Sequence, residues 1–195
     1  VFYIFSMKLS WSHKLFLRIN ASIGKNFHRD RFMIFCANIL VFLMLVFAIV
    51  YGLYAWSQEG YGSWLKLYLE LFVITFLCAE FVSYLFAIVF KHPRPRIEFP
   101  ESKQLIHTVG TWKSFPSDHT IGAFLLAGVL LLVPFTPVWL IVALYISAVF
   151  VSFSRVYVGV HYPRDIIGGF VVANLILGLL PLVLYHIVEP FSFLW

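Results

Sequence analysis

Long apolar runs limit this chain to one kind of environment. Residues 32–56 contain no charged side chain in 25 consecutive positions, and residues 64–90 form a second apolar run of similar length. About 20 apolar residues of helix are enough to cross a bilayer core. The chain is 62% hydrophobic and 12% charged, with a mean hydropathy of +0.91, whereas soluble domains carry about 25% charged residues. The sequence therefore predicts an all-α, polytopic integral membrane bundle.

Three further apolar runs follow, at residues 117–133, 138–153 and 166–188. The first two are only 17 and 16 residues long. At 1.5 Å per residue they reach about 25 Å, so we expect the polar groups at their ends to lie slightly below the lipid headgroups. That depth would suit a site that acts on a lipid headgroup.

The N-terminal region has a different pattern. Residues 7–27 mix apolar side chains such as Trp11 with basic ones such as Lys14, which is typical of a helix lying in the membrane interface. We therefore expect about five transmembrane helices plus an N-terminal interfacial helix. The predicted organisation is a single membrane domain over residues 1–195, with an interfacial anchor at 1–30 and a transmembrane bundle at 31–190 that carries a site-bearing loop at 91–117.

Counting the spans places four helix ends together. The second span ends at Lys91 and the third begins at Ser117. The fourth ends near Arg155 and the fifth begins near Asp165. Because an alternating path through the membrane brings these ends to one face, the polar segments beside them should meet.

Residues 154–165, between the last two spans, gather two arginines, one histidine and one aspartate. His161 and Asp165 would share one face of a helix if the chain is helical there, and Pro163 is suited to a first helical turn. An aspartate that accepts one ring N–H fixes the tautomer and leaves the other nitrogen free as nucleophile or base. The alternative is a basic juxtamembrane anchor in which Asp165 only caps a helix.

Two further segments would join this one. Lys91 and Arg94 lie in a run whose prolines stop the helix and hold the cations in an extended chain. Pro116 and Ser117 can start a helix whose free N–H groups point at an anion. No three His, Cys, Asp or Glu residues have the tight spacing of metal ligands, so we expect neither a metal nor a cofactor.

Together these groups match the needs of phosphoryl transfer without a metal. Cations neutralise the phosphoryl oxygens, one histidine attacks phosphorus and another protonates the leaving oxygen. Taken singly, each group also has a structural explanation: Arg94 as a snorkelling anchor, Ser117 as a helix cap and His119 as a polar residue at a helix start. Their joint occurrence favours a site.

The residues in question are Arg94-Pro95, Pro116-Ser117-Asp118-His119, and Ser154-Arg155 followed after five residues by His161 and after three more by Asp165. In type and spacing they resemble the three signatures of the type 2 phosphatidic acid phosphatase superfamily. The resemblance covers roughly residues 60–190. The chain looks most like the small undecaprenyl-diphosphate phosphatases associated with bacitracin resistance.

The resemblance implies that His161 is a nucleophile that becomes phosphohistidine, that Asp165 orients it and that His119 is the general acid. It also implies a substrate-binding set made of Lys91, Arg94, Ser117, Asp118 and Arg155.

Two positions depart from the signatures. The lysine expected seven residues before Arg94 is Ala87 here, so that role is either missing or taken by Lys91. Asp118 stands where the superfamily usually has glycine. Its carboxylate would disfavour a bound phosphate unless it faces away or meets a cation such as Lys113.

By resemblance, the chain is a metal-independent lipid phosphatase that converts a polyprenyl diphosphate to the monophosphate. Its partners would be the lipid substrate and the bilayer. Phosphatidylglycerol phosphate, phosphatidate and lipid A stay open as substrates, and a non-enzymatic anion transporter or channel subunit is the alternative from another class. Basic residues flank the spans and form no solvated stripe, which favours anionic lipid over nucleic acid.

Two questions concern charge within or near the membrane. Basic residues concentrate on the face of the site, so the positive-inside rule predicts that this face is cytoplasmic. The resemblance implies the outer, periplasmic face of a bacterial inner membrane, and we follow it because Lys91, Arg94 and Arg155 have a phosphate-binding reason to be there. Glu80 lies inside the second span, where we expect a protonated or hydrogen-bonded packing role with Ser83 or Asn174 as partner.

Overall fold

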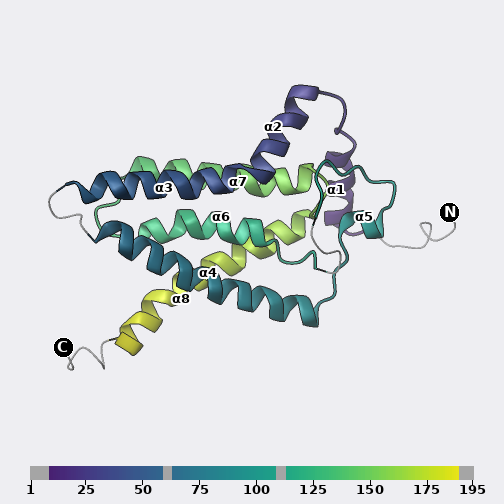
Figure 1. Cartoon of the computed structure of the whole chain (residues 1–195). Helices are drawn as coiled ribbons and strands as arrows, with labels where there is room; N and C mark the ends of the chain where they lie inside the picture. The colour runs from purple at the N-terminus through teal and green to yellow at the C-terminus, as the bar shows by residue number, and fades with distance from the viewer. Residues whose placement is uncertain (1–8, 59–62, 109–112, 189–195) are drawn as a thin grey trace.

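The computed structural model describes residues 9–58, 63–108 and 113–188. All regular structure in these ranges is helical, as predicted. The helices are α1 (Trp11–Asn20), α2 (Phe27–Asn38), α3 (Leu40–Trp56), α4 (Trp64–Val89), α5 (Pro95–Glu98), α6 (Asp118–Gly128), α7 (Val138–Tyr157) and α8 (Pro163–Val188), with a 3-10 turn η2 (Val129–Leu131) after α6 (Figure 1).

Three of the described helices are long and apolar enough to cross a membrane: α4, α7 and the Pro163–Leu180 part of α8. The pair α2 and α3 makes a fourth crossing if it is counted as one span. A polytopic membrane bundle is therefore confirmed. The start of α4 at Trp64 and the start of α8 at Pro163 agree with the sequence prediction.

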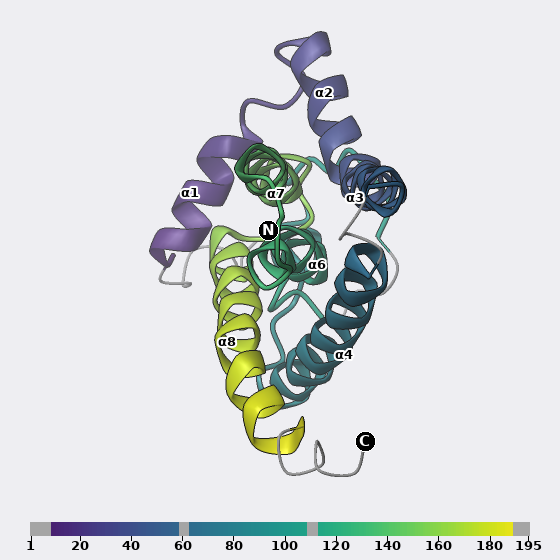
Figure 2. The same ribbon diagram turned by 90° about the vertical axis from the view of Figure 1, so that its left-hand side faces the viewer.

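The helix α6 occupies the centre of the bundle, with α3, α4, α7 and α8 around it (Figure 2). Every residue from Thr120 to Gly128 is buried. With 11 residues, α6 is shorter than its neighbours. The run at 117–133, predicted as a third span, is thus an internal helix enclosed by the others.

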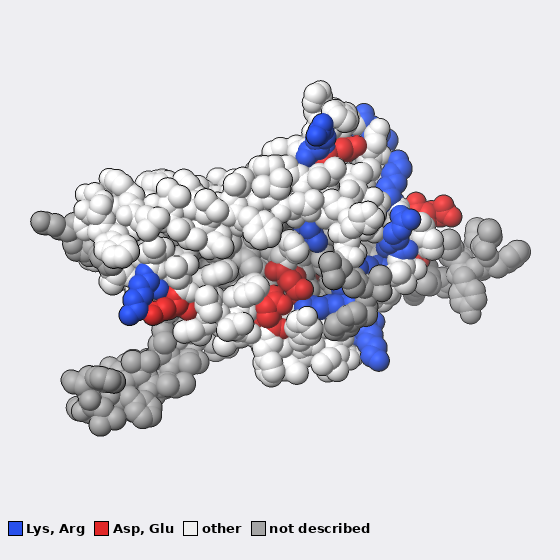
Figure 3. Space-filling view, viewed as in Figure 1, with Lys and Arg blue, Asp and Glu red and all other residues white. Residues whose placement is uncertain are grey.

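The polar ends of the helices meet as predicted. The ends of α4 and α7 and the starts of α6 and α8 lie at one end of the bundle, where α1 and α5 also lie (Figure 1). Charged side chains gather at this end, whereas most of the remaining visible surface is uncharged (Figure 3). The predicted site residues therefore come from segments that are neighbours in space.

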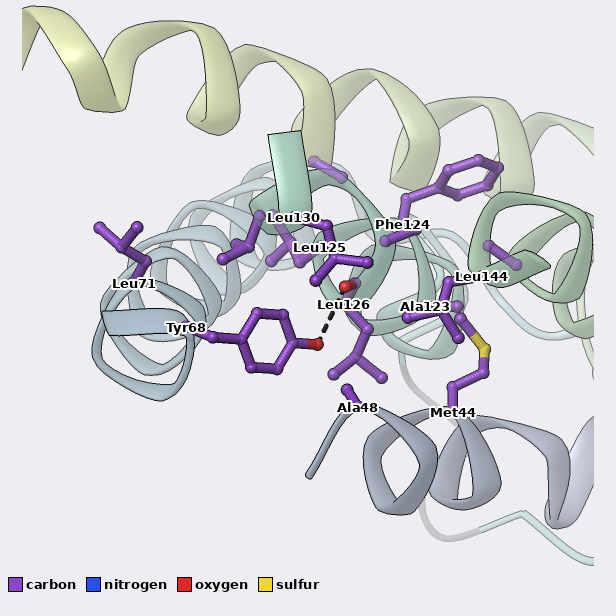
Figure 4. Close-up of a cluster of buried hydrophobic side chains, with 14 of the residues drawn as sticks. Met44, Ala48, Tyr68, Leu71, Ala123, Phe124, Leu125, Leu126, Leu130 and Leu144 are labelled. Carbon is purple, nitrogen blue, oxygen red and sulfur yellow. Dashed lines mark hydrogen bonds between the residues drawn. The ribbon is translucent and has the colours of Figure 1, made fainter. Parts of the chain in front are cut away.

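The core holds α6 at a fixed depth. Leu125 and Leu126 of α6 pack between Met44 and Ala48 of α3 and Tyr68 of α4 (Figure 4). The Tyr68 hydroxyl, which is buried among these side chains, donates a hydrogen bond of 2.9 Å to the Leu126 carbonyl. A buried tyrosine hydroxyl needs such a partner, so this bond favours one register of α6 along α4.

The charge-free run at 32–56, predicted as the first span, is bent. The axes of α2 and α3 meet at 55° around Ile39. The Ala37 carbonyl accepts a hydrogen bond of 3.0 Å from the Arg155 guanidinium, in the place where a continuous helix would present the N–H of Val41. A side chain inserted into the helical hydrogen-bond ladder is a known cause of kinks. The bend thus leaves a main-chain acceptor for the guanidinium of Arg155, a predicted site residue.

Candidate active site

His161 lies in the tight turn between α7 and α8. The turn needs Gly159, whose φ of +87° is disfavoured for other residues and whose added Cβ would lie 2.2 Å from the Lys103 carbonyl oxygen. His161, two residues further along the turn, is 3% exposed. Its Nδ1 lies 3.0 Å from the carbonyl oxygen of Ser114. Because a carbonyl can only accept, Nδ1 must carry the proton in this bond, which leaves the lone pair on Nε2.

Asp165 lies close to the imidazole for a different reason from the one predicted. The helix α8 begins at Pro163, so His161 precedes it and the two residues do not share a helix face. Instead the Asp165 carboxylate folds back and Oδ2 accepts the N–H of Tyr162 at 2.8 Å, as in a capping box. This places Oδ2 3.5 Å from His161 Nδ1.

Ser114 connects the histidine and the aspartate. Its carbonyl oxygen holds His161 Nδ1, and its hydroxyl donates a hydrogen bond of 2.6 Å to Asp165 Oδ2. Sequence reasoning missed this residue, because a serine two positions before Pro116 carries no signal of its own. The orienting role predicted for Asp165 stays a prediction, and in this geometry Ser114 shares it.

The surroundings keep the His161 ring neutral. Burial is the largest influence and lowers its pKa from 6.5, although the Asp165 carboxylate raises it. The cationic side chains of Arg155 and Arg94 lower the pKa of His161 further. A neutral imidazole with a free lone pair is the form that can act as a nucleophile.

Arg94 and Arg155 approach the turn from two sides. Arg94 donates a hydrogen bond of 3.3 Å from Nη1 to the Val160 carbonyl, and Arg155 donates to Ala37 as described above. In both guanidinium groups the buried Nε has no hydrogen-bond partner among the described residues. Burial lowers the pKa of Arg94, while Asp118 and Asp165 raise it. Two guanidinium groups with N–H donors to spare, one buried (Arg155) and one partly buried (Arg94), are suited to an oxyanion.

The start of α6 lies against the same turn. Ser117 is the N-cap residue of α6, as predicted, and its N–H donates a hydrogen bond of 3.1 Å to the Asp165 carbonyl. Its hydroxyl is buried and makes no hydrogen bond with the described residues. Gly169 of α8 permits this contact, because an added Cβ would lie 2.8 Å from the Ser117 carbonyl oxygen.

His119 follows in the first turn of α6 and is partly buried. The charged or titratable side chains with the strongest electrostatic interactions with His119 are Arg155, His161, Asp118 and Arg94. The two histidines therefore belong to one electrostatic cluster. This is the arrangement expected if one attacks phosphorus and the other protonates a leaving group, although both roles stay predictions.

Asp118 meets a cation, as the sequence suggested. Its Oδ1 pairs with the Lys113 ammonium and accepts a hydrogen bond of 3.0 Å from the Ser83 hydroxyl.

The expected partners of Glu80 were wrong. Glu80 Oε2 lies 3.9 Å from the Lys113 ammonium, whereas Asn174 donates to the Phe170 carbonyl.

Lys91 lies on the exposed side of its segment and makes no hydrogen bond or ion pair with the described residues. Its substrate-binding role stays a prediction. Ala87, where the signature would place a lysine, is buried on the face of α4 that also carries Ser83 and Glu80.

Within the described ranges, no three His, Cys, Asp or Glu side chains lie close enough to hold a metal ion.

Comparison with known proteins identifies the family of this chain. A sequence model described as the PAP2 superfamily matches residues 67–188, which is more than half of the chain. The undecaprenyl-diphosphatase BcrC of Bacillus subtilis (strain 168) is 34% identical over 118 residues, 60% of this chain and 58% of that protein. The putative undecaprenyl-diphosphatase YbjG of Escherichia coli (strain K12) is 31% identical over 155 residues, 80% of this chain and 73% of that protein. The match thus spans less than two thirds of the Bacillus relative.

Two solved structures share the fold. LpxE of Aquifex aeolicus superposes with a TM-score of 0.65 at 21% identity, covering 87% of this chain and 94% of that one. A PAP2 type phosphatidylglycerolphosphate phosphatase from Bacillus subtilis superposes with a TM-score of 0.53 at 18% identity, covering 90% and 95%. With the three signature segments gathered at one end of the bundle and the sequence match over most of α4 to α8, the chain belongs to the PAP2 superfamily.

Proposed function

We propose that this protein is a membrane lipid phosphatase that hydrolyses undecaprenyl diphosphate, a polyprenyl diphosphate, to the monophosphate. The observation that carries the proposal is the imidazole of His161, whose Nδ1 is hydrogen-bonded to the Ser114 carbonyl while Nε2 stays available in a cluster with Arg94 and Arg155. Relatives named undecaprenyl-diphosphatase support the choice of substrate.

In the proposed reaction, Nε2 of His161 attacks the terminal phosphorus of the diphosphate. The bond from that phosphorus to the bridging oxygen breaks, and the electron pair stays with the lipid phosphate. Arg94, Arg155 and the N-terminus of α6 neutralise the phosphoryl oxygens, and His119 supplies a proton to the leaving oxygen. Water then attacks the phosphohistidine, gives its proton to His119 and releases inorganic phosphate.

The direct test is phosphate release by the purified protein in detergent from four lipids: undecaprenyl diphosphate, phosphatidylglycerol phosphate, phosphatidate and lipid A. We expect the highest kcat/KM with undecaprenyl diphosphate, no loss of activity in EDTA and inhibition by vanadate. A higher kcat/KM with another lipid would replace the proposed substrate. Activity lost in EDTA and restored by Mg²⁺ would contradict the metal-free mechanism, and no release from any of the four would favour an anion transporter or channel subunit.

The dependence on pH should follow the state of His161. The attacking form is the neutral ring, and burial holds its pKa below 6.5. As pH falls, the decline in kcat/KM that comes from protonation of His161 should therefore be centred below pH 6.5, as the folded protein takes up this proton. A profile of kcat/KM between pH 4 and 8 measures this limb. An acid limb centred above pH 6.5 would argue against His161 as the nucleophile.

We also propose that the site faces the outside of a bacterial inner membrane. His107→Cys places a thiol on an exposed position of the site-bearing loop, and Lys66→Cys places one near the start of α4, at the opposite end of the bundle. In a protein whose exposed Cys78 is replaced, a membrane-impermeant maleimide should label the first thiol in intact cells and the second only after permeabilisation. The reverse pattern would place the site in the cytoplasm, as the basic residues suggest.

A further inference from the structure

Lys113 is the one buried lysine in the described part of the chain, with 8% of its surface exposed. Its ammonium pairs with Asp118 Oδ1, lies 3.9 Å from Glu80 Oε2 and lies 4.4 Å from the centre of the Tyr84 ring. Glu80 precedes the end of α4 at Val89 by nine residues, which is about 13 Å of helix. The cluster therefore reaches into the depth of the membrane, where ionisable side chains are rare and usually functional.

The segment 113–119 has two faces. On one face, Ser114 and Ser117 make the hydrogen bonds to His161 and Asp165 in the turn before α8. On the other face, Lys113 and Asp118 contact Glu80 and Ser83 of α4. The ammonium thus lies beside the reaction centre, on the side away from the histidine that attacks.

The ammonium can bind a further anion. It carries three N–H donors, and Asp118 is its one hydrogen-bond acceptor among the described residues. Glu80, at 3.9 Å, is beyond hydrogen-bond distance. The side chain of Asp118 is 41% exposed, so the pair lies at an opening and not in a sealed core. Acidic side chains are visible near the middle of the surface in Figure 3, with basic side chains beside them.

We propose that Lys113 binds the phosphate that stays on the lipid when a diphosphate is cleaved, and so favours diphosphates over monophosphates. This inference rests on the proposed function. Asp118 directly precedes His119, the predicted general acid. The Lys113 ammonium therefore forms its ion pair with the residue next to that acid. A phosphate leaving past His119 toward α4 would reach Lys113.

The chemistry of the two substrate classes explains the preference. When the bond to the bridging oxygen of a diphosphate breaks, the electron pair stays on the lipid phosphate and raises its negative charge by one. A nearby ammonium stabilises that charge directly. When a monophosphate ester is cleaved, the leaving group is an alkoxide, which needs the proton of His119 more than it needs a cation. Lys113 should therefore matter for the first reaction and little for the second.

The two acidic side chains hold the ammonium in place before substrate binds. A lysine without such partners inside a membrane would turn its ammonium toward the interface. Asp118 pairs with the ammonium of Lys113 at close range, and Glu80 lies 3.9 Å from it. Since Asp118 is also held by Ser83, the ammonium can turn to a phosphate oxygen while the carboxylate keeps a hydrogen bond.

The test compares Lys113→Met with the unaltered protein on undecaprenyl diphosphate and on phosphatidate, which has no second phosphate. We expect kcat/KM to fall about 10²- to 10³-fold with the diphosphate, the range for one preorganised donor, and less than about 10-fold with phosphatidate. The inhibition constant of farnesyl monophosphate, a product analogue, should rise about 10-fold or more. Equal losses on both substrates with an unchanged inhibition constant would overturn the inference.

Three further variants separate this role from folding. Lys113→Arg keeps the charge and should keep most of the preference. Lys113→Met combined with Asp118→Asn removes the unpaired carboxylate, so thermal stability should recover while the preference stays lost. Lys66→Met makes the same change at an exposed lysine of α4 and should leave kcat/KM unchanged for both substrates. If the unaltered protein does not hydrolyse the diphosphate at all, the proposed function fails, which is a different outcome from a variant that loses both activities equally.

Discussion

His161→Ala should abolish phosphate release from every lipid substrate, by at least about 10⁴-fold in kcat, because the variant lacks the proposed covalent nucleophile. The loss should not reflect unfolding. In the described structure, the ring donates a single hydrogen bond, to the Ser114 carbonyl. Losing that partner leaves a buried acceptor, which costs about 1–3 kcal/mol in the free energy of unfolding.

Labelling that is quenched with SDS at alkaline pH makes this result specific. The unaltered protein, mixed with a substrate that carries ³²P in its terminal phosphate, should show an acid-labile, base-stable phosphoprotein within the first turnover. His161→Ala should show none, with near-normal thermal unfolding in detergent. His119→Ala serves as the comparison, because it should still form the phosphoprotein from a diphosphate, although slowly. Phosphoprotein or sustained turnover in His161→Ala would rule out the proposed nucleophile.

Arg155→Ala should lower kcat/KM about 10²- to 10³-fold, or about 2.7–4 kcal/mol of transition-state stabilisation. Arg155 is buried in the last turn of α7, and the hydrogen bond to Ala37 fixes its guanidinium while Nε keeps its donor. Arg155→Lys should restore little of this activity, since a compact ammonium cannot contact Ala37 and a phosphoryl oxygen with the same fixed geometry. Steady-state kinetics on the preferred lipid measures both variants.

Arg29→Ala is the matched control for Arg155. Arg29 also links α2 to α7, through a hydrogen bond of 2.9 Å to the Tyr157 hydroxyl, but it is not among the residues of the candidate site. If Arg155 acted only by holding α2 against α7, the two alanine variants would lose similar activity. We expect Arg29→Ala to keep near-normal kcat/KM, and a comparable loss in both variants would remove Arg155 from the phosphate site.

The helical bundle and the meeting of its polar ends could be predicted because they depend on local and additive properties. Apolar runs of known length must be helical in lipid, where every backbone N–H and C=O needs an internal partner. The bounds of α4 and the start of α8 at Pro163 follow from such signals. The alternation of spans then brings His119, Arg155 and His161 to one end.

The bend at Ile39 and the burial of α6 could not be predicted in this way. Both depend on contacts between segments distant in the sequence: Arg155 reaches the carbonyl of Ala37, and Tyr68 reaches the carbonyl of Leu126. A charge-free run looks the same whether it is straight or broken. A short apolar run looks the same whether it faces lipid or protein.

The candidate site, like the fold, has features that the sequence predicts and features that only the tertiary structure decides. Residue types and spacing determined which side chains could carry phosphoryl transfer, because histidine, arginine and aspartate are costly in a membrane and were few enough to identify. Only the tertiary structure decided that a carbonyl of Ser114 sets the tautomer of His161, and that Lys113 lies buried between Asp118 and Glu80. Every residue has a carbonyl and lysines are common near membranes, so neither group is distinctive in a sequence. Their function depends on which group lies within about 3–4 Å, and that follows from the packing of α4, α6 and α8 together.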